Sequence, residues 1–566
     1  MMNRTVIVER DSRGLTAQVL QVLSDFEGIE TAVQRVETAA RALMPFASYD
    51  DAFQAAAADQ IPIITTRVSW FSNGCEIIAV RKFGGPCLGG GWAPAAEAYP
   101  DHFGAVADWD GTTGTDNTTA LRAWLAYGKQ CRGRPGRYRV VGGLEFAASN
   151  ETLDGRGMEI IHDTSEISVV LAAIDVTNSK ICGFVINGMK SLKSGLGVQS
   201  AHGITYENSN GLRIENNTVF DCLEHGIAGR SQSSNMYIMN NRITNCGNAA
   251  TQRGAGIFMF GGNDNAVVSG NMLFGNEWGL GYDDSSDPPR ANIISRRVTI
   301  TGNVVVGTNP LEGAYRFEGS QQAVITGNVG IGYGMGVQCR KIQSDRLSEQ
   351  VAITGNTFEA TRACISLSSS IGVTVTGNSL RVSVEDTSIE RCCVEVYSQT
   401  FPRAERIVIS GNTMETTQHG VLIGRSASHN LPPQPLVVVV GNIISYVSST
   451  AAVNYYAVWA SALRRVSVRD NEITGFFIGV VGESYVNGDL TIRGNEITGC
   501  VSHAIRLSPG GLATTSVFGN RTWGNGGGGL RLESSANRIE TSIAYNFFAE
   551  GINGSASSTR QTANVV

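Results

Sequence analysis

A short motif, Ile-x-Gly-Asn or a close variant, recurs along most of this 566-residue chain. Each copy ends in an asparagine that lies three residues after an isoleucine or valine. These thirteen asparagines are Asn217, Asn241, Asn271, Asn303, Asn328, Asn356, Asn378, Asn412, Asn442, Asn471, Asn495, Asn520 and Asn546. The twelve intervals between them run from 22 to 34 residues and average 329/12, about 27. Self-similarity at this period predicts a solenoid, in which one supersecondary unit stacks on copies of itself.

Each repeat contains short runs of alternating character. Val298-Thr299-Ile300 leads into one asparagine, and Gly336-Val337-Gln338-Cys339 follows another. Alternation over four to six residues, bounded by Gly, Asn and Ser, indicates strands. A repeat of 22 residues is too short for helical pairs but holds three short strands with their turns. We therefore predict an all-β parallel β-helix, in which the fixed asparagine suits both a left-handed turn and a stacked amide ladder.

Composition excludes several classes of function. A net charge of -6 and a pI of about 5.8 provide no basic surface for nucleic acid. The chain has no run of 18 apolar residues, so we expect no membrane insertion, and its start lacks the apolar region of a cleaved export signal. Eleven cysteines without a CxxC pair predict no disulfide framework, and we expect buried, reduced thiols. No zinc-binding motif is present, and we expect neither a metal nor a cofactor.

The first hundred residues have a different pattern. Apolar residues spaced alternately by four and three predict a coiled coil within residues 1–44: Leu15, Val19, Val22, Phe26, Ile29, Val33, Val36, Ala40 and Leu43. The alternative is one amphipathic helix that packs on the chain's own core. Residues 45–100, rich in proline and glycine, are predicted to form a small adaptor module of mixed structure.

Three segments within residues 101–150 resemble the start of the pectate-lyase-like right-handed β-helix superfamily. They are Phe103-Gly104-Ala105, the stretch from Gly114 to Leu121, and Gly136-Arg137-Tyr138. Asp116 or Asn117 would cap a helix that ends at Gly128 and covers the first coil of the solenoid. The resemblance implies that residues 101–150 start and cap the β-helix and that residues 151–566 form it.

The order of coiled coil, small module and long β-helix resembles the tailspike depolymerases of tailed bacteriophages. That resemblance implies a homotrimer in the virion, attached through its N-terminus to a tail or baseplate protein. It also implies a host surface polysaccharide as ligand: capsule, lipopolysaccharide or exopolysaccharide. The chain ends at Val566, about one coil past Asn546, without the separate C-terminal domain of many tailspikes. Host specificity would then depend on the β-helix surface.

The candidate site follows from strand register. In the strand that follows each asparagine turn, the second and fourth residues after a small starting residue should face outward, because strand side chains alternate. This places two carboxylates on neighbouring coils beside arginines and aromatic rings, the side chains that a glycan groove requires. The candidate catalytic residues are Asp283, Glu318, Glu395 and Asp287. The candidate substrate-binding residues are Phe258, Phe260, Arg316, Gln338, Arg340 and Tyr397.

Each candidate also has a plain structural alternative. An outward carboxylate is usually solvated or paired, and Asp283 with Arg316 would form an ordinary ion pair between coils. The acidic segment 282–289 suggests Ca²⁺ by its composition, but it lacks EF-hand spacing and is better described as a turn. His225, next to Glu224, is either a structural histidine or a base.

Glycosidic hydrolysis is the preferred reaction. Two carboxyl groups about 5 Å apart favour retention of configuration, and about 6.5 to 9.5 Å favours inversion. A second hypothesis is β-elimination of a uronic-acid polymer, with Arg316, Arg340 or Tyr397 as base and carboxylate neutraliser. A third is a receptor-binding fibre without enzymatic activity. A fourth is a bacterial polysaccharide lyase or epimerase unrelated to phage.

Overall fold

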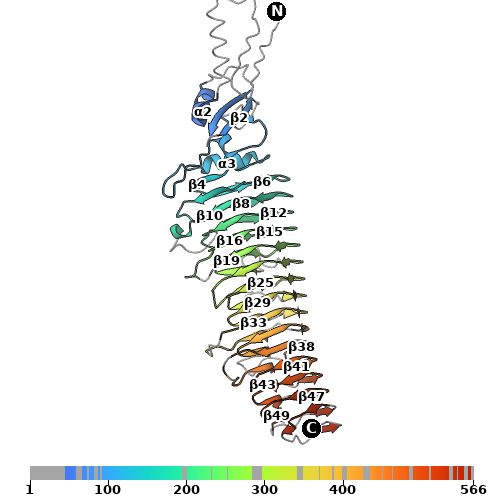
Figure 1. Cartoon of the computed structure of the whole chain (residues 1–566). Coiled ribbons are helices and arrows are strands. Elements are labelled where there is room, and N and C mark those ends of the chain that lie inside the picture. The colour runs from blue at the N-terminus through green and yellow to red at the C-terminus, as the bar shows by residue number, and fades with distance from the viewer. Residues whose placement is uncertain are drawn as a thin grey trace, which may run out of the picture. The chain divides into compact units, whose positions relative to one another are not determined.

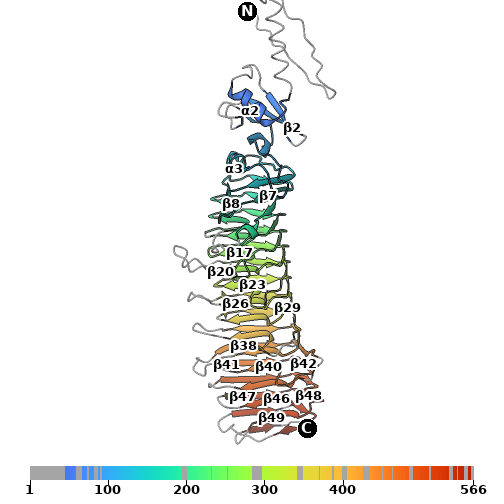
Figure 2. The same ribbon diagram turned by 90° about the vertical axis from the view of Figure 1, so that its left-hand side faces the viewer.

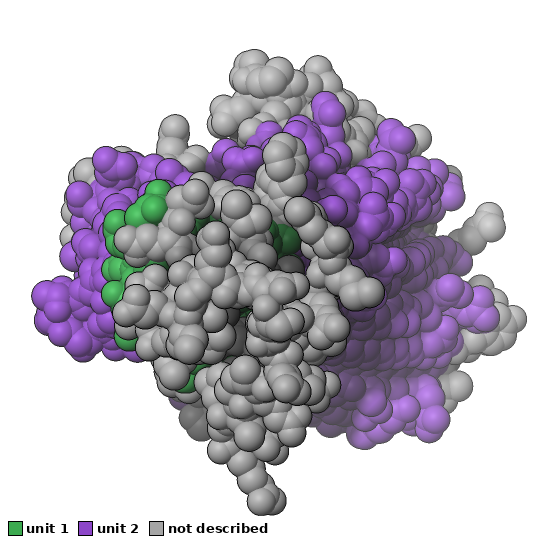
Figure 3. All heavy atoms as spheres, turned by 90° about the horizontal axis from the view of Figure 1, so that it is seen from above, with its two compact units in different colours: residues 1–106 green, residues 107–566 purple. Residues whose placement is uncertain are grey.

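The computed structural model describes residues 45–566, and it leaves out short gaps at 59–66, 73–74, 82–86, 89–91, 194–200, 231, 252, 284–295, 341–347, 369, 385–387, 398–404, 425–433, 449, 451, 462, 484–487, 509–511, 534–539, 545, 554–558 and 563–566. The coiled coil predicted within residues 1–44 lies outside the described residues. The chain divides into two compact units, residues 1–106 and 107–566 (Figure 3).

The first unit combines helix and antiparallel sheet. Its elements are α2 (Tyr49–Ala57), β1 (Arg67–Ser72), β2 (Cys75–Arg81), β3 (Trp92–Pro94) and the 3-10 helix η1 (Pro100–Phe103), and its three strands form one sheet in the order β1-β2-β3. The fully buried Trp70 packs edge-on against the Tyr49 and His102 rings at 5.7 and 5.8 Å between centroids. This mixed structure lies mostly within residues 45–100, and the assignment of that range as an adaptor module stays a prediction.

The second unit is a solenoid of three parallel sheets with sixteen strands each (Figures 1 and 2). Sheet A contains β4 (Gly136–Val140), β7 (Met158–His162), β10 (Val185–Asn187), β13 (Thr218–Phe220), β16 (Arg242–Thr244), β19 (Met272–Phe274), β22 (Val304–Val306), β25 (Val329–Ile331), β29 (Thr357–Ala360), β33 (Ser379–Val382), β36 (Thr413–Thr416), β39 (Ile443–Tyr446), β42 (Glu472–Thr474), β45 (Glu496–Thr498), β48 (Arg521–Trp523) and β51 (Phe547–Phe548).

Sheet B contains the strands that carry the candidate site: β5 (Leu144–Phe146), β8 (Leu171–Ile174), β11 (Ile204–Glu207), β14 (Ile227–Gly229), β17 (Ala255–Phe260), β20 (Trp278–Asp283), β23 (Gly313–Glu318), β26 (Met335–Arg340), β30 (Ala363–Ser368), β34 (Cys392–Tyr397), β37 (His419–Ile423), β40 (Tyr456–Ala460), β43 (Ile478–Glu483), β46 (His503–Ser508), β49 (Gly528–Leu532) and β52 (Ile552–Asn553).

Sheet C contains β6 (Thr152–Asp154), β9 (Lys180–Cys182), β12 (Arg213–Glu215), β15 (Tyr237–Met239), β18 (Val267–Ser269), β21 (Thr299–Thr301), β24 (Val324–Thr326), β28 (Ala352–Thr354), β32 (Thr374–Thr376), β35 (Ile407–Ser410), β38 (Gln434–Val440), β41 (Leu463–Arg469), β44 (Gly488–Arg493), β47 (Leu512–Phe518), β50 (Glu540–Ala544) and β53 (Thr559–Thr562). A 3-10 helix, η2 (Lys190–Lys193), and a two-stranded sheet of β27 (Ser348–Glu349) and β31 (Ser370–Ile371) lie outside the three long sheets. Each coil thus supplies one strand to every sheet, which confirms the predicted parallel β-helix.

The asparagine ladder is continuous through the core. Neighbouring members of the thirteen are joined by hydrogen bonds from Nδ2 to Oδ1 of 2.8 to 3.1 Å, and each side chain is at most 2% exposed. The predicted amide ladder is confirmed. The prediction that these asparagines adopt the left-handed conformation is wrong, because at the twelve positions where the preceding residue is described that residue has the positive φ, as in Gly355 (φ 63°) before Asn356. Glycine lacks a Cβ and takes that conformation without strain, which leaves the asparagine free to bond along the stack.

The helix α3 (Thr118–Tyr127) begins and ends as predicted, with Asn117 as N-cap residue and Gly128 in the left-handed conformation after it. The Asp116 carboxylate accepts hydrogen bonds from the Thr118 N–H (3.0 Å) and hydroxyl (2.6 Å). Leu121, Trp124 and Leu125 are buried, and α3 packs against β5 of the first coil. The helix therefore covers the end of the apolar core, as the sequence predicted.

The cysteines behave as small apolar residues. The ten thiols whose side chains are described are free and buried, which confirms the prediction for these positions. Burial raises the pKa of the Cys339 thiol to about 12 and that of Cys500 to about 12, so both stay protonated at neutral pH. Within the described residues, none of the helices has the length and apolar character needed to cross a membrane.

Candidate functional site

The outward face of sheet B has the register predicted from the sequence. Gly281, Arg316 and Gln338 lie side by side on β20, β23 and β26, and Glu318 lies beside Arg340. Inward residues of the same strands, such as Tyr315, are fully buried in the core. The candidates on these three coils are therefore neighbours in space, although their roles stay predictions.

Glu318 is held by two arginines. Its Oε1 accepts hydrogen bonds from Arg316 Nε at 2.6 Å and from Arg340 Nε at 2.8 Å, and its side chain is 4% exposed. The Arg316 guanidinium also lies over the Trp278 ring, 4.2 Å from the centroid. Both donors are cationic and occupy the same carboxylate oxygen, so Glu318 suits the role of an electrostatic stabiliser or base better than that of a proton donor.

A second pair of carboxyl groups was missed by the sequence analysis. Glu277 and Glu312 directly precede β20 and β23, which places them at equivalent positions of adjacent coils. Burial raises the pKa of Glu277, and the charge of Glu312 raises it further. Burial also raises the pKa of Glu312, and the charge of Glu318 adds to this, while Arg316 and Arg340 oppose it. Strand alternation predicts which residues within a strand face outward. Glu277 and Glu312 lie one residue before the first residue of their strands, so alternation did not identify them.

Three polar atoms in this region are buried and lack a hydrogen-bond partner among the described residues. They are Trp278 Nε1, Glu312 Oε2 and Gln338 Oε1. The cation nearest to Glu312 Oε2 is Arg316 Nη1, at 3.5 Å and without hydrogen-bond geometry. A buried polar atom without a partner costs about 1 to 3 kcal/mol, so we expect water or a polar ligand to satisfy these three atoms on neighbouring coils.

Of the other candidate acids only Glu395 has a described side chain, and it lies apart from this place. Glu395 lies three strands from Arg316 in sheet B, about 14 Å at the usual strand spacing, and its Oε1 accepts a 2.5 Å hydrogen bond from the Ser366 hydroxyl. Asp283 ends β20, where its backbone pairs with Phe260. Asp287 lies outside the described residues. Tyr397 is half-buried in the same strand as Glu395, and burial raises the pKa of its hydroxyl.

Phe258, one of the two aromatic residues predicted to contact substrate, is covered by another side chain. Its ring stacks on His225 with centroids 4.7 Å apart and planes 7° apart, and it is 3% exposed. The ring also lies against Gly281, where an added Cβ would come within 2.4 Å of Phe258 Cδ2, so that position requires glycine. Phe260, half-buried, packs edge-on against Phe258 at 4.7 Å.

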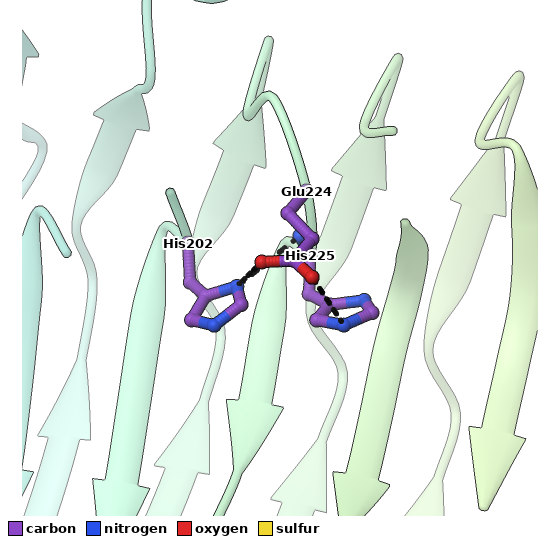
Figure 4. Close-up of side chains that lie close together, drawn as sticks. All are labelled: His202, Glu224 and His225. Atoms are coloured by element: carbon purple, nitrogen blue, oxygen red, sulfur yellow. Dashed lines mark hydrogen bonds and ion pairs between the residues drawn. The ribbon is translucent and has the colours of Figure 1, made fainter. Parts of the chain in front are cut away.

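Next to this stack, a glutamate lies between two histidines (Figure 4). Glu224 Oε2 is 3.5 Å from His202 Nδ1, and Glu224 Oε1 is 3.8 Å from His225 Nε2. A neutral imidazole has one lone pair, and in His225 it accepts the Ala255 N–H at Nδ1 (2.9 Å). Both nitrogens of His202 face donors, the His225 N–H at 3.4 Å and Arg230 Nη2 at 3.3 Å. No free lone pair is left on either ring, so this donor set does not fit a metal ion, and the structural alternative for His225 is favoured.

These buried histidines predict acid sensitivity. Burial and the Arg230 charge lower the pKa of His225 to about 3, and burial together with the charges of His225 and Arg230 lowers the pKa of His202 well below its usual value. In the unfolded chain each histidine binds a proton near pH 6.5, whereas in the folded chain it stays neutral. The free energy of unfolding that this difference contributes is therefore fully present above pH 6.5 and is lost as the pH falls towards 3. Each histidine contributes a slope of about 1.4 kcal/mol per pH unit in that window.

The substitution His225→Asn tests this prediction, because Asn Oδ1 can still accept the Ala255 N–H but does not titrate. Thermal unfolding between pH 4 and 7 is expected to show a shallower pH dependence for the variant than for the wild type, even though the lost stacking lowers its stability at pH 7. An unchanged slope would mean that His225 is protonated in the folded protein.

A cavity of about 530 Å³ lies away from these carboxyl groups, beside the end of α3 and the first coils. Charged residues at its edge include Arg122, Lys129, Glu145 and Glu151. Six strand steps of sheet B separate β5, which carries Glu145, from β23, about 29 Å at the usual spacing. We place the candidate site on β20 to β26, where the buried polar atoms are, because pocket volume alone does not indicate chemistry.

Comparison with known proteins identifies the family. The model of the right-handed β-helix region matches residues 153–400 and 372–548, more than half of the chain. Among solved structures, the N-terminal fragment of gene product 12 of bacteriophage phi29 is 12% identical over 82% of this chain and 92% of that chain, with a TM-score of 0.53. The tailspike protein of Dettilon is 15% identical over 64% of this chain and 67% of that chain, with a TM-score of 0.41.

PfbA, a surface adhesin of Streptococcus pneumoniae, is 14% identical over 77% of this chain and 92% of that chain, with a TM-score of 0.42. A comparison with curated protein sequences gave no match. At sequence identities of 12% to 15%, structural similarity shows a shared fold and nothing about function. The family model and the three parallel sheets agree with the resemblance found in the sequence, and the chain belongs to the right-handed β-helix family.

Proposed function

We propose that this protein is a tailspike of a bacteriophage virion that binds a host surface polysaccharide and hydrolyses its glycosidic bonds. The observation that carries the proposal is the set of three buried, unpartnered polar atoms of Trp278, Glu312 and Gln338 beside the Arg316–Glu318–Arg340 network. Sugar hydroxyl groups both donate and accept hydrogen bonds, so a glycan can complete all three. The tailspike-like order of sequence segments supports the assignment to a virion.

Glu312 and Glu318 suit the two roles of a glycosidase. Glu312, whose pKa is raised by burial, would protonate the leaving oxygen, and Glu318, bonded to two arginines, would stabilise positive charge or act as a base. Both carboxyl groups contact the same Arg316 guanidinium, which keeps them within reach of one glycosidic bond. Asp283, Asp287 and Glu395 stay alternative partners.

The chemistry of the site favours hydrolysis over β-elimination. Arg316 Nε and Arg340 Nε, two candidate groups for a lyase, both donate to Glu318 and are engaged. Tyr397, the third, has a pKa raised by burial, which makes its phenolate harder to form. A lyase therefore lacks an available base among these residues.

The test is an assay against a panel of purified capsular and O-antigen polysaccharides and sodium polygalacturonate. We expect new reducing ends without ultraviolet absorbance from at least one polymer. Absorbance from an unsaturated ring would indicate the lyase, and binding without new ends would indicate a receptor-binding fibre. No binding to any polymer would contradict the proposal.

The assembly and attachment of the protein remain part of the proposal. The heptad Leu15 to Leu43 supports a trimer, and residues 1–44 would attach it to a tail or baseplate protein. Sedimentation of the full chain at three times 60.2 kDa would support the trimer, whereas a monomer would contradict it.

A further inference from the structure

The C-terminal half of sheet B carries a second cluster of aromatic and charged side chains. Tyr456 begins β40, and its ring lies edge-on to Trp459 with centroids 5.4 Å apart. Arg506 of β46 places its guanidinium 5.4 Å from the Tyr456 centroid and donates a hydrogen bond to Glu483 of β43. The Arg506 and Glu483 side chains are 18% and 21% exposed, so both are partly accessible from the surface.

This cluster resembles the first site in the strand positions of its residues, although the arginine and the glutamate share one strand in the first site and lie on neighbouring strands in the second. Trp278 and Tyr456 are each the first residue of a strand, Arg316 and Arg506 each the fourth, and Glu318 and Glu483 each the sixth. In both places an arginine covers an aromatic ring of an earlier coil and pairs with a glutamate. Figure 2 shows β20, β23 and β26 in the middle of the solenoid and β40 and β46 further along it.

The second cluster also contains buried polar atoms without a hydrogen-bond partner among the described residues. They are Trp459 Nε1 and Arg506 Nε. Both atoms are donors, so the ligand must supply acceptors, which are the hydroxyl and carboxylate oxygens of a polysaccharide. The half-buried rings of Trp459 and Tyr455 add flat apolar surface of the kind that contacts the face of a sugar ring.

An apolar cluster separates the two sites. Met335, Ala363 and Cys392 occupy the first strand position on the coils between them, and they pack with Leu422 at 2% exposure or less. From β20 to β40 there are six strand steps, about 29 Å at the usual spacing. A short oligosaccharide cannot reach across this distance, but a polymer chain can.

We propose that Tyr456, Trp459, Glu483 and Arg506 form a second polysaccharide-binding site, which holds a distant segment of the polymer that occupies the Trp278–Glu318 region. The inference rests on the proposed function. Two linked contacts on one polymer raise its apparent affinity through effective concentration, and they do not change the affinity for a fragment that fills one site.

The experiment uses the full chain and one polysaccharide of the panel that binds the wild type, together with a short oligosaccharide prepared from it. Arg506→Met keeps the packing on Tyr456 and removes the charge, and Trp459→Phe keeps a ring and removes the Nε1 donor. Arg531→Met is the matched control, because Arg531 lies beside Arg506 on the next coil, is 49% exposed and pairs only loosely with Glu533 at 3.8 Å.

We expect each test variant to weaken polymer binding about tenfold, the effect of losing one charge-assisted or buried hydrogen bond, and to change oligosaccharide binding less than twofold. The control should bind like the wild type. Unchanged polymer binding in both test variants, with normal thermal unfolding, would overturn the second site and leave the proposed function intact. Equal losses for polymer and oligosaccharide would show a single site and also overturn it. If the wild type binds no polymer, the result contradicts the proposed function itself, and the second site with it.

Discussion

Replacing Glu312 with glutamine is expected to lower turnover of the polysaccharide by two or more orders of magnitude. The amide cannot donate the proton that the leaving oxygen requires, and general acid catalysis commonly contributes this much. Glycan binding should persist, because Trp278, Gln338 and the arginines remain. Reducing-end formation measures turnover, and binding to the immobilised polymer measures affinity.

Stability provides a control within the site. Glu312→Gln removes a carboxyl group whose pKa is raised by burial, so the variant loses a charge that burial disfavours and the melting temperature should change little. Glu318→Gln leaves Arg316 and Arg340 without their shared carboxylate, and loss of one partner of a buried pair costs about 3 to 5 kcal/mol. Its loss of activity must therefore be measured below its lowered melting temperature.

A matched control lies on another sheet. Glu415 on β36 is 48% exposed and has a distant partner, Arg381, at 3.9 Å, so Glu415→Gln should retain full turnover. Near-wild-type turnover of Glu312→Gln would reject Glu312 as the acid, and Glu277, Asp283 and Glu395 would be tested next. Loss of binding together with turnover would make this region a recognition surface without catalysis.

Replacing Asn356 with leucine is expected to destabilise the β-helix by about 3 kcal/mol or more. Asn356 Nδ2 donates to Ile325 O and to Asn378 Oδ1, both at 2.9 Å, and its Oδ1 accepts from the Asn328 N–H (2.9 Å) and Nδ2 (3.0 Å). Leucine leaves these groups buried without a partner, and each costs about 1 to 3 kcal/mol.

Asn356→Asp is the graded control for this effect. Neutral aspartate keeps an oxygen for Asn328 and has one O–H in place of two N–H groups, so it loses one of the two bonds to Ile325 and Asn378; the ionised form would also introduce a buried charge. The free energy of unfolding in urea should be highest for the wild type and lowest for the leucine variant. The comparison is made at acid pH, where the aspartate is neutral. A leucine variant as stable as the wild type would show that the ladder contributes no net stability.

Strand alternation explains why part of the candidate site could be located from the sequence. The positions of Arg316, Glu318, Gln338 and Arg340 follow from a period of two and from the repeat spacing, and both are local properties of the chain. Glu277 and Glu312 were missed because they stand one residue before their strands, where alternation gives no direction. Their importance comes from burial and neighbouring charge, and these exist only after the coils stack.

The sequence alone determined the solenoid, its three strands per coil, the buried asparagine ladder and the capping helix, because each depends on residue spacing and local hydrogen bonding. It did not determine which residue takes the left-handed turn, and it could not show that the flat face of Phe258 is covered by His225. Only the tertiary structure decided that Glu318 is held between two arginines, that Glu224 bridges two histidines, and that an arginine–aromatic–glutamate cluster occurs twice on one sheet. Most of those contacts join residues on different coils, and their side-chain distances depend on packing rather than on order along the chain.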